Sequence, residues 1–404
     1  MDGPLNDALL ITLTGADRPG ITAEIATLVA QSGATLLDVE QVVVGTRLNL
    51  NFLVRLDAPD TDSKPLLKEV LWKARELDMH ADFHLMEPEA PGPKRATWAV
   101  TLLADPISAD VLAGAAQAIQ AHGFNIDRIN RLSGKALSAL ELIVGAPADD
   151  NERVRRLQAS LVGLQAELGC DIAVQAEGLT RRSKRLVVMD MDSTLIKQEV
   201  IDELARAYGV LERVADITHR AMNGELDFDQ ALRERVKLLA GAPVSILDDV
   251  QARLELTPGA ESLLAVLQRL GYRLAVISGG FIEIVEPFRR KLGLDYGFAN
   301  QLGIRDGRLT GEVLGPIVNR RRKADLLESL AQTERISLDQ VIAIGDGAND
   351  LDMLDRAGLG IAFNAKRVVR EKARHAINQP SLASILYLLG IRDEDLPAVG
   401  LRGS

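Results

Sequence analysis

The chain has 404 residues, of which 47% are apolar, 26% are charged and 3% are aromatic, and its formal net charge is −10. This length exceeds what one hydrophobic core normally holds, so two or three domains are expected. The acidic balance and the few aromatic residues argue against nucleic acid as a partner, because phosphates need a basic face and bases stack on aromatic rings. No apolar run approaches the roughly 20 residues that a membrane span requires, so no membrane association is expected.

The only cysteine is Cys170, which excludes an intrachain disulfide and is typical of a reducing compartment. The first apolar run, at residues 8–13, is too short for the core of a secretion signal, and no basic segment precedes it. We therefore expect a cytoplasmic protein.

Residues 6–88 show the order β-α-β-β-α-β, and residues 95–177 repeat it. In the first unit, apolar residues recur at helical spacing at Ile21, Ile25, Leu28 and Val29. Its predicted strands are 9–14, 35–44, 48–56 and 80–86, with a second helix at 65–77. The second unit has predicted strands at 97–103, 125–132, 137–144 and 171–175 and helices at 108–122 and 150–168. The sequence thus predicts two α+β ferredoxin-like domains in tandem, with linkers at 88–94 and 178–184.

The first predicted strand and helix are joined by the turn Asp17-Arg18-Pro19-Gly20. This turn resembles that of ACT domains, which bind amino acids and regulate metabolic enzymes. The resemblance implies an amino-acid effector at Asp17 and Gly20, and a homodimer formed through the ACT domains. The corresponding turn of the second unit, 105–108, lacks the glycine that would let the backbone approach an effector. The alternative for the first turn is a proline-initiated helix start that binds nothing.

From residue 184 to 390 the pattern is that of an α/β domain. The predicted strands are 186–189, 273–277, 340–344 and 359–363, and the helices between and after them are 260–270, 282–292, 323–332 and 351–356. This alternation predicts a doubly wound parallel sheet. Residues 197–256 carry only helical patterns, at 200–208, 211–222, 229–239 and 244–254, and are predicted to form a small helical cap. A hairpin with turns at Asp306-Gly307 and Thr310-Gly311 is predicted before the third strand.

Polar groups follow the predicted strands where each one ends. They are Asp190 and Asp192 after the first strand, Ser278 and Gly279 after the second, and Asp346, Asn349 and Asp350 after the third, with Lys323 near the start of a helix. Because the carboxyl ends of parallel strands meet at one edge of a sheet, we expect these groups to converge. Carboxylates suit Mg²⁺, and a hydroxyl with backbone N–H groups at a helix start suits phosphate. Each group alone has a simpler explanation as a helix cap, a flexible turn or a solvated charge.

The four motifs of the haloacid dehalogenase-like phosphatases are matched by Asp190-x-Asp192-x-Thr194, Ser278, Lys323 and Gly345-Asp346-x-x-Asn349-Asp350. More narrowly, residues 184–390 resemble the phosphoserine phosphatases. The sequence segments that carry this resemblance are Asp190-Met-Asp-Ser-Thr-Leu-Ile, Ala221-Met-Asn-Gly224, Leu232-Arg-Glu-Arg235-Val and Ser278-Gly-Gly-Phe281. Two ACT domains ahead of such a domain are typical of the long bacterial form, of the mycobacterial type.

The resemblance implies hydrolysis of O-phospho-L-serine, the last step of serine biosynthesis, through an aspartyl-phosphate intermediate. Asp190 would be the nucleophile and Asp192 the proton donor and general acid-base. Mg²⁺, with Mn²⁺ as the alternative, would be held by Asp190, Asp192 through its main-chain carbonyl, and Asp346. Serine would then be the effector expected at the ACT domains.

The remaining roles also follow from the resemblance. Ser278, Gly279 and Lys323 would bind the phosphoryl oxygens, with Asn349 touching phosphate or substrate and Asp350 orienting the metal shell.

Specificity is expected in the cap. Glu199 suits the substrate ammonium and Arg235 its carboxylate, whereas Met222 and Phe228 would close an apolar lid. Composition alone would make Glu199 and Arg235 ordinary surface charges. Two other hypotheses stay open: the same chemistry on another small phosphomonoester, and a serine sensor with a degenerate phosphatase half.

Overall fold

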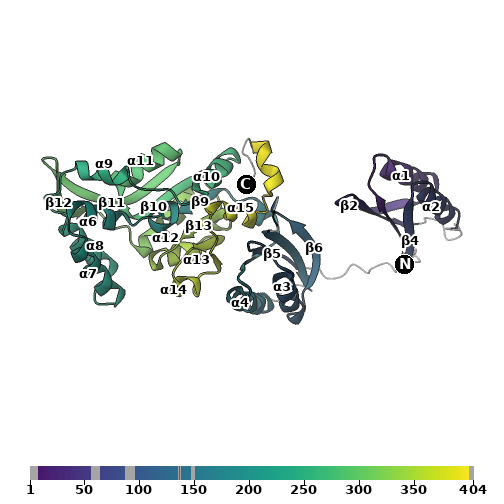
Figure 1. The fold of residues 1–404 in the computed structure, drawn as a ribbon, viewed down its shortest axis with the longest axis horizontal. Helices are drawn as coiled ribbons and strands as arrows, with labels where there is room; N and C mark the ends of the chain where they lie inside the picture. Colours follow the sequence, from purple (N-terminus) through teal and green to yellow (C-terminus); the bar gives the residue numbers. More distant parts are fainter. Residues whose placement is uncertain are drawn as a thin grey trace. The chain divides into compact units, whose positions relative to one another are not determined.

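The computed structural model describes residues 8–55, 64–86, 96–134, 136, 138–146 and 151–399. The chain separates into two compact units, Met1–Pro93 and Lys94–Ser404 (Figure 1). The linker predicted at 88–94 lies outside the described residues. Among the helices of the described ranges, none has the length and apolar character needed to cross a membrane.

The first unit is a four-stranded antiparallel sheet with the strand order β2-β3-β1-β4 and two helices. Its elements are β1 Ala8–Ala16, α1 Ile21–Gln31, β2 Thr35–Val44, β3 Arg47–Arg55, α2 Lys64–Glu76 and β4 Met79–Met86. Alternate residues of β1, such as Ile11 and Leu13, are buried with Ile21 and Ile25 of α1. The apolar residues that recur every second position along the strand and about every 3.6 positions along the helix therefore pack into one core, as the sequence predicts.

The second unit begins with the same fold, in the strand order β6-β7-β5-β8. Its elements are β5 Ala96–Leu103, α3 Ala109–Ala121, β6 Asn125–Arg131, β7 Ala139–Ala146, α4 Asn151–Leu168 and β8 Asp171–Ala176. At the first strand–helix junction, the Ser108 side chain caps α3 by accepting a hydrogen bond from the Val111 N–H. A side-chain cap thus stands where the first unit has a left-handed glycine.

The remainder of the second unit is built on a seven-stranded sheet with the order β12-β11-β10-β9-β13-β14-β15. The strands are β9 Leu186–Met189, β10 Arg273–Phe281, β11 Tyr296–Arg305, β12 Arg308–Leu314, β13 Val341–Gly345, β14 Leu359–Phe363 and β15 His375–Ile377. All neighbours are parallel except β11 and β12. β9 lies at the centre, so its carboxyl end is flanked by those of β10 and β13.

Helices cover both faces of this sheet. One core joins Val187 and Met189 to α10 Ala260–Arg269 and α11 Ile282–Leu292, and the other joins Leu186 and Val188 to α12 Arg320–Thr333 and α13 Leu351–Arg356. Alternate residues of β9 thus enter opposite cores, which makes its run of four apolar residues necessary. The predicted doubly wound sheet is confirmed.

The predicted cap consists of four helices between β9 and α10. They are α6 Val200–Tyr208, α7 Leu211–Met222, α8 Phe228–Lys237 and α9 Ser245–Gln251. A capping box fixes the start of α8, because the Asp227 carboxylate accepts from the Gln230 N–H while the Gln230 side chain accepts from the Asp227 N–H. This start sets the position of Phe228 and, two turns later, of Arg235.

One local expectation is wrong, and three short elements were missed. The turn predicted at Thr310-Gly311 is part of β12, where Gly311 has φ +83 and lies so close to the cap that a Cβ would fall 2.8 Å from the Ala240 Cβ. Glycine serves close approach there rather than a chain reversal. Strand β15 and the short helices α14 Arg367–Arg370 and α15 Ile385–Leu388 were not predicted, because elements of three or four residues show no periodicity.

The segment predicted as a linker at 178–184 is packed. It contains the short helix α5 Leu179–Arg182, and the Arg181 side chain is buried between the carboxylates of Glu141 and Glu177. Lys184 is also buried and donates to the Asp339 carbonyl. The basic residues suggest a solvated tether. Glu177 is near in the sequence, but Glu141 and Asp339 are 40 and 155 residues away from their partners and are invisible to local patterning.

The second ferredoxin-like domain therefore joins the doubly wound domain through a core-like interface. Leu103, Leu132, Ala139 and Ala173 on its sheet belong to the same apolar cluster as Ile377, Leu386 and Leu388. The face that a ferredoxin-like sheet leaves open is covered here by the chain's own C-terminal region.

We expect Arg181→Met to lower the free energy of unfolding by about 3–5 kcal/mol, because the buried Glu141 carboxylate would lose its cation and Glu177 would lose one of its two. The matched control is Arg182→Met, since Arg182 pairs with the same Glu177 but is 71% exposed; its effect should stay below about 1 kcal/mol. Urea unfolding of the two variants measures both. Equal losses would show that the buried pair does not hold this junction.

Candidate active site

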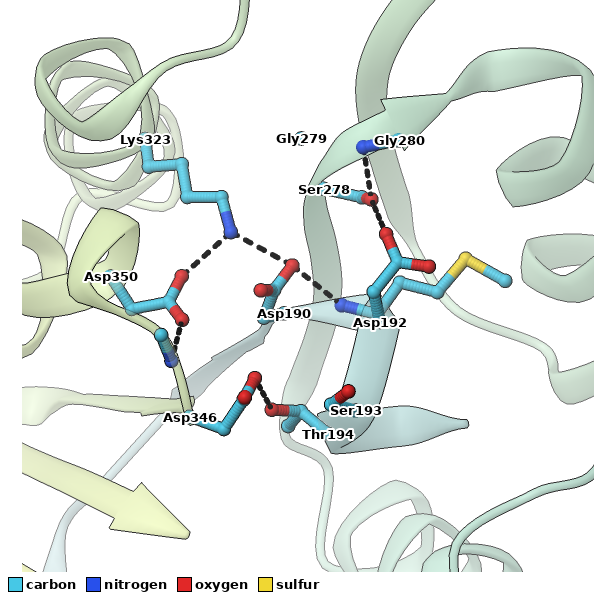
Figure 2. Close-up of polar contacts among 12 residues, drawn as sticks. Asp190, Asp192, Ser193, Thr194, Ser278, Gly279, Gly280, Lys323, Asp346 and Asp350 are labelled. Atoms are coloured by element: carbon cyan, nitrogen blue, oxygen red, sulfur yellow. Dashed lines mark hydrogen bonds and ion pairs between the residues drawn. The ribbon is translucent and has the colours of Figure 1, made fainter. Parts of the chain in front are cut away.

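The site lies where β9, β10 and β13 end (Figure 2). Asp190 follows β9 and is 3% exposed, and its N–H donates to the Ile344 carbonyl of β13 over 2.9 Å. The chain then turns sharply at Ser193, which has φ +56, a conformation that residues other than glycine seldom adopt. The turn sends the Asp192 side chain to Ser278 at the end of β10 (Figure 2). In an extended strand the side chains of Asp190 and Asp192 would point to opposite faces, but here both line the same cavity.

Lys323 is the charge at the centre of the site. It is fully buried, with its Nζ 2.8 Å from the Asp190 Oδ1 and 2.6 Å from the Asp350 Oδ1 (Figure 2). Asn319 caps its helix by accepting from the Arg322 N–H. Burial opposes the charge, but the two carboxylates prevail and raise the pKa of Lys323, so the ammonium persists.

Three carboxylates form a cluster with oxygen atoms within 4.8 Å of one another: Asp190, Asp346 and Asp350. Thr194 Oγ1 donates to Asp346 over 3.2 Å, and the Gly347 N–H donates to Asp350 over 2.9 Å (Figure 2). Position 345 requires glycine, since the Cβ of any other residue would fall 2.5 Å from the Asp350 Cγ. Crowded carboxylate oxygens are the donors that Mg²⁺ prefers, so the residues fit that ion.

Three carboxyl groups of the site, those of Asp190, Asp192 and Asp346, have raised pKa values. Burial, and then the neighbouring Asp350 charge, raise the pKa of Asp346 to about 7 and that of Asp190 well above its usual range. Burial, and then the Glu199 charge, raise the pKa of Asp192 to about 7. A carboxyl at position 192 is therefore partly protonated near neutral pH, as a proton donor must be.

The end of β10 forms a cradle in which a hydroxyl group lies beside backbone N–H groups. The fully buried Ser278 Oγ accepts from the Gly280 N–H over 2.8 Å and donates to Asp192 over 3.2 Å. A Cβ on Gly279 would fall 3.1 Å from the Phe228 ring of the cap. Asn300 of β11, which sequence reasoning missed, donates to the carbonyls of Gly279 and Gly280 and accepts from the Val318 N–H. An amide inside a strand pattern gives no local signal of such a contact.

Above the cradle lies a cavity of about 660 Å³. The sequence-predicted residues that line it are Asp190, Asp192, Glu199, Met222, Phe228, Arg235, Gly279, Asp346 and Asn349. Ser193, also missed, donates to Glu199 over 2.8 Å. Burial lowers the pKa of Arg235, partly offset by Asp202, whereas Met222 is 69% exposed at the mouth. Lys366, Val368 and Val369 add a wall that was not predicted.

The expected effector residues lie in the first unit. Gly20 has φ +100 and begins α1, and the Asp17 N–H donates to the Thr46 carbonyl. Asp17 itself is exposed. The left-handed backbone explains the glycine, whether or not an effector binds.

The comparisons with known proteins agree with this architecture. A family described as haloacid dehalogenase-like hydrolase matches residues 187–355, and ACT domains match 7–84 and 96–175. Phosphoserine phosphatase of Streptomyces coelicolor is 46% identical, over 96% of this chain and 94% of its own length. Phosphoserine phosphatase SerB2 of Mycobacterium tuberculosis is 42% identical, over 98% and 96%. The crystal structure of a probable phosphoserine phosphatase from Vibrio cholerae is 34% identical, covering 78% of this chain and 91% of that one, with a TM-score of 0.58.

The fold and the site define a haloacid dehalogenase-like hydrolase preceded by two ACT domains. Because the identity extends along almost the whole of both chains, the chain belongs to the phosphoserine phosphatase family. The fold class and the family predicted from the sequence are confirmed, including the second ACT domain, whose turn lacks the glycine.

We expect Asp346→Asn to stabilise the metal-free protein more at pH 7.5 than at pH 5. The raised pKa of Asp346 means that its contribution to stability is present below about pH 4 and is lost as pH rises through about 7. The neutral amide removes this loss, and the additional gain at pH 7.5 should be about 1–2 kcal/mol after allowing for partial exposure. Urea unfolding with a chelator at both pH values measures it; a gain that does not change with pH would contradict the assigned crowding.

Proposed function

We propose that this chain is a Mg²⁺-dependent phosphatase that hydrolyses O-phospho-L-serine to L-serine and phosphate. The observation that carries this proposal is the buried Lys323 between Asp190 and Asp350, because Asp190 lines the same cavity as Glu199 and Arg235. The names of relatives that match nearly the whole chain support the substrate. With it we propose the domain boundaries 6–88, 95–177 and 184–390, the cap at 197–256, and a location in the cytoplasm.

The first chemical step belongs to Asp190 and Asp192. A carboxylate oxygen of Asp190 bonds to phosphorus while the bond from phosphorus to the serine oxygen breaks, giving an aspartyl-phosphate. Asp192 gives its proton to the departing oxygen. In the second step Asp192 takes a proton from water as the water oxygen attacks phosphorus, which releases phosphate and restores the Asp190 carboxylate. The raised pKa of Asp192 suits both directions of transfer.

The negative charge of the nucleophile and the phosphoryl group is neutralised by the groups around them. Mg²⁺, held by Asp190, Asp346 and the Asp192 carbonyl, would neutralise charge between the nucleophile and the phosphoryl group; Mn²⁺ has the same oxygen preference. Lys323 and the Ser278–Gly279 cradle hold phosphoryl oxygens, and Asn349 reaches them from the β13 loop. Asp350 belongs to the carboxylate cluster and pairs with Lys323, so it contacts the groups of the site directly.

Selectivity for an amino-acid phosphate rests on two opposite charges in the cavity. Glu199, fixed by Ser193, pairs with the ammonium, and Arg235 pairs with the carboxylate in a two-pronged geometry. Phe228 closes over Gly279 and, with Met222, excludes water from the first step. The two ACT domains support regulation by an amino acid, which we take to be serine acting at Asp17 and Gly20, and assembly into a homodimer.

Phosphate release from O-phosphoserine tests the assignment. Wild type should turn over with Mg²⁺ and stop with chelator, and Asp190→Asn should lose at least about a thousandfold in kcat because the nucleophile is removed. Equal rates for the two proteins, or turnover that ignores the chelator, would refute the mechanism.

Arg235→Ala separates this substrate from another small phosphomonoester. Losing one charge-assisted contact should lower kcat/KM for O-phosphoserine by about 10- to 100-fold. Hydrolysis of p-nitrophenyl phosphate, which has no amino-acid carboxylate, should change by less than about threefold. A uniform effect on both substrates would favour the other phosphomonoester.

Inhibition by serine tests the effector site. Gly20→Ala strains a backbone at φ +100 and should shift the inhibition curve about tenfold to higher serine. The matched control is Gly33→Ala, which strains φ +72 at the other end of the same helix with open space around it. An unchanged Gly20→Ala curve, or the same shift in both variants, would remove this turn from the account.

A further inference from the structure

Asp171, the first residue of β8 in the second ACT domain, is buried. In the part of the chain that the structure describes, the donors to its carboxylate are Asn378 and Gln379, which follow β15 in the phosphatase domain. Its Oδ2 accepts from the Asn378 N–H over 2.7 Å and from the Gln379 Nε2 over 2.8 Å, and its Oδ1 accepts from the Asn378 Nδ2 over 2.9 Å. Three donors from two consecutive residues fix the chain directly after β15. A buried carboxylate tolerates this position only because these donors replace water.

The segment after β15 holds in turn the segment after β14. The Asn364 N–H donates to the Ile377 carbonyl over 2.8 Å, and the Asn364 Nδ2 donates to the Gln379 carbonyl over 3.1 Å. Asn364 has φ +46, which asparagine tolerates better than most residues, and this bend ends β14. Residue 364 is therefore placed by Gln379, which Asp171 also binds, and by Ile377, which directly precedes the other donor, Asn378.

The bend at Asn364 leads directly into the active-site wall. Lys366, Val368 and Val369 line the same cavity as Asp190 and Arg235. Only the buried Ala365 separates the bend from that wall. The reacting groups themselves stand directly after β9 and β13 and on α12, not on this segment.

We propose that Asp171 is a positioning residue of the second ACT domain that sets the cavity wall at 365–369 through Asn378, Gln379 and Asn364. This wall shapes substrate binding and leaves the chemical step alone. The effect on substrate rests on the proposed function, whereas the order of the wall does not.

Asp171→Ala should raise KM for O-phosphoserine about three- to tenfold, the size of one or two lost hydrogen bonds, with kcat within about twofold. Amide hydrogen exchange at 365–370 should become faster in the same variant, without substrate. Asp171→Asn keeps one acceptor and should fall between wild type and Asp171→Ala. The matched control is Gln175→Ala: Gln175 lies on the same face of β8, is buried, and donates to the Leu388 carbonyl, away from Asn364.

A double-mutant cycle then tests the route. Asn364→Gly keeps the bend but removes the contact to Gln379, so it should raise KM alone by a similar factor and add little to Asp171→Ala. This variant leaves the junction intact and stays informative if Asp171→Ala fails to fold. Equal KM values and equal exchange in Asp171→Ala and Gln175→Ala, or additive effects in the cycle, would overturn the proposal. If wild type does not hydrolyse O-phosphoserine but Asp171→Ala still shows faster exchange at 365–370, the proposed function is rejected. The proposed link from Asp171 to the cavity wall is then retained.

Discussion

The site depends on one buried ammonium. Lys323 stands between Asp190 and Asp350 with no exposure to solvent, and it ties the helix α12 to the ends of β9 and β13. A buried charge is tolerated only with such partners, and removing the ammonium would leave the buried carboxylates uncompensated. The same contacts fix the Asp190 carboxylate and, in the proposed mechanism, place a cation beside the phosphoryl oxygens. Structure and chemistry are therefore set by a single interaction.

One ammonium does not balance three carboxylates. Asp190, Asp346 and Asp350 lie within reach of a common ion, and burial and mutual repulsion raise the pKa of Asp190 and Asp346. This arrangement is unfavourable for folding and favourable for binding a divalent cation, as is common where function opposes stability. The strained Ser193 and the glycine at 345 belong to the same compromise, since each lets backbone and carboxylates approach closely.

The sequence predicted the elements with long, clear periods. The limits of α6, α7, α13 and β14 agree residue for residue with the pattern, because their apolar faces repeat over a full element or their ends are marked by turn residues. The convergence at the sheet edge also followed from topology alone. What it did not predict are contacts between residues distant in the chain: the Asn300 brace, the Ser193–Glu199 pair and the packed segment around Arg181. Polar side chains show their partners only in three dimensions.

The central claim is that residues about 150 positions apart hold one divalent ion beside the nucleophile. Calorimetric titration of Mg²⁺ into the full-length protein tests it most directly, with Asp346→Asn and the exposed control Asp355→Asn alongside. The account predicts one site in wild type and in Asp355→Asn, and at least about a tenfold weaker affinity in Asp346→Asn. Equal affinity in all three proteins, or no binding by wild type, would contradict it.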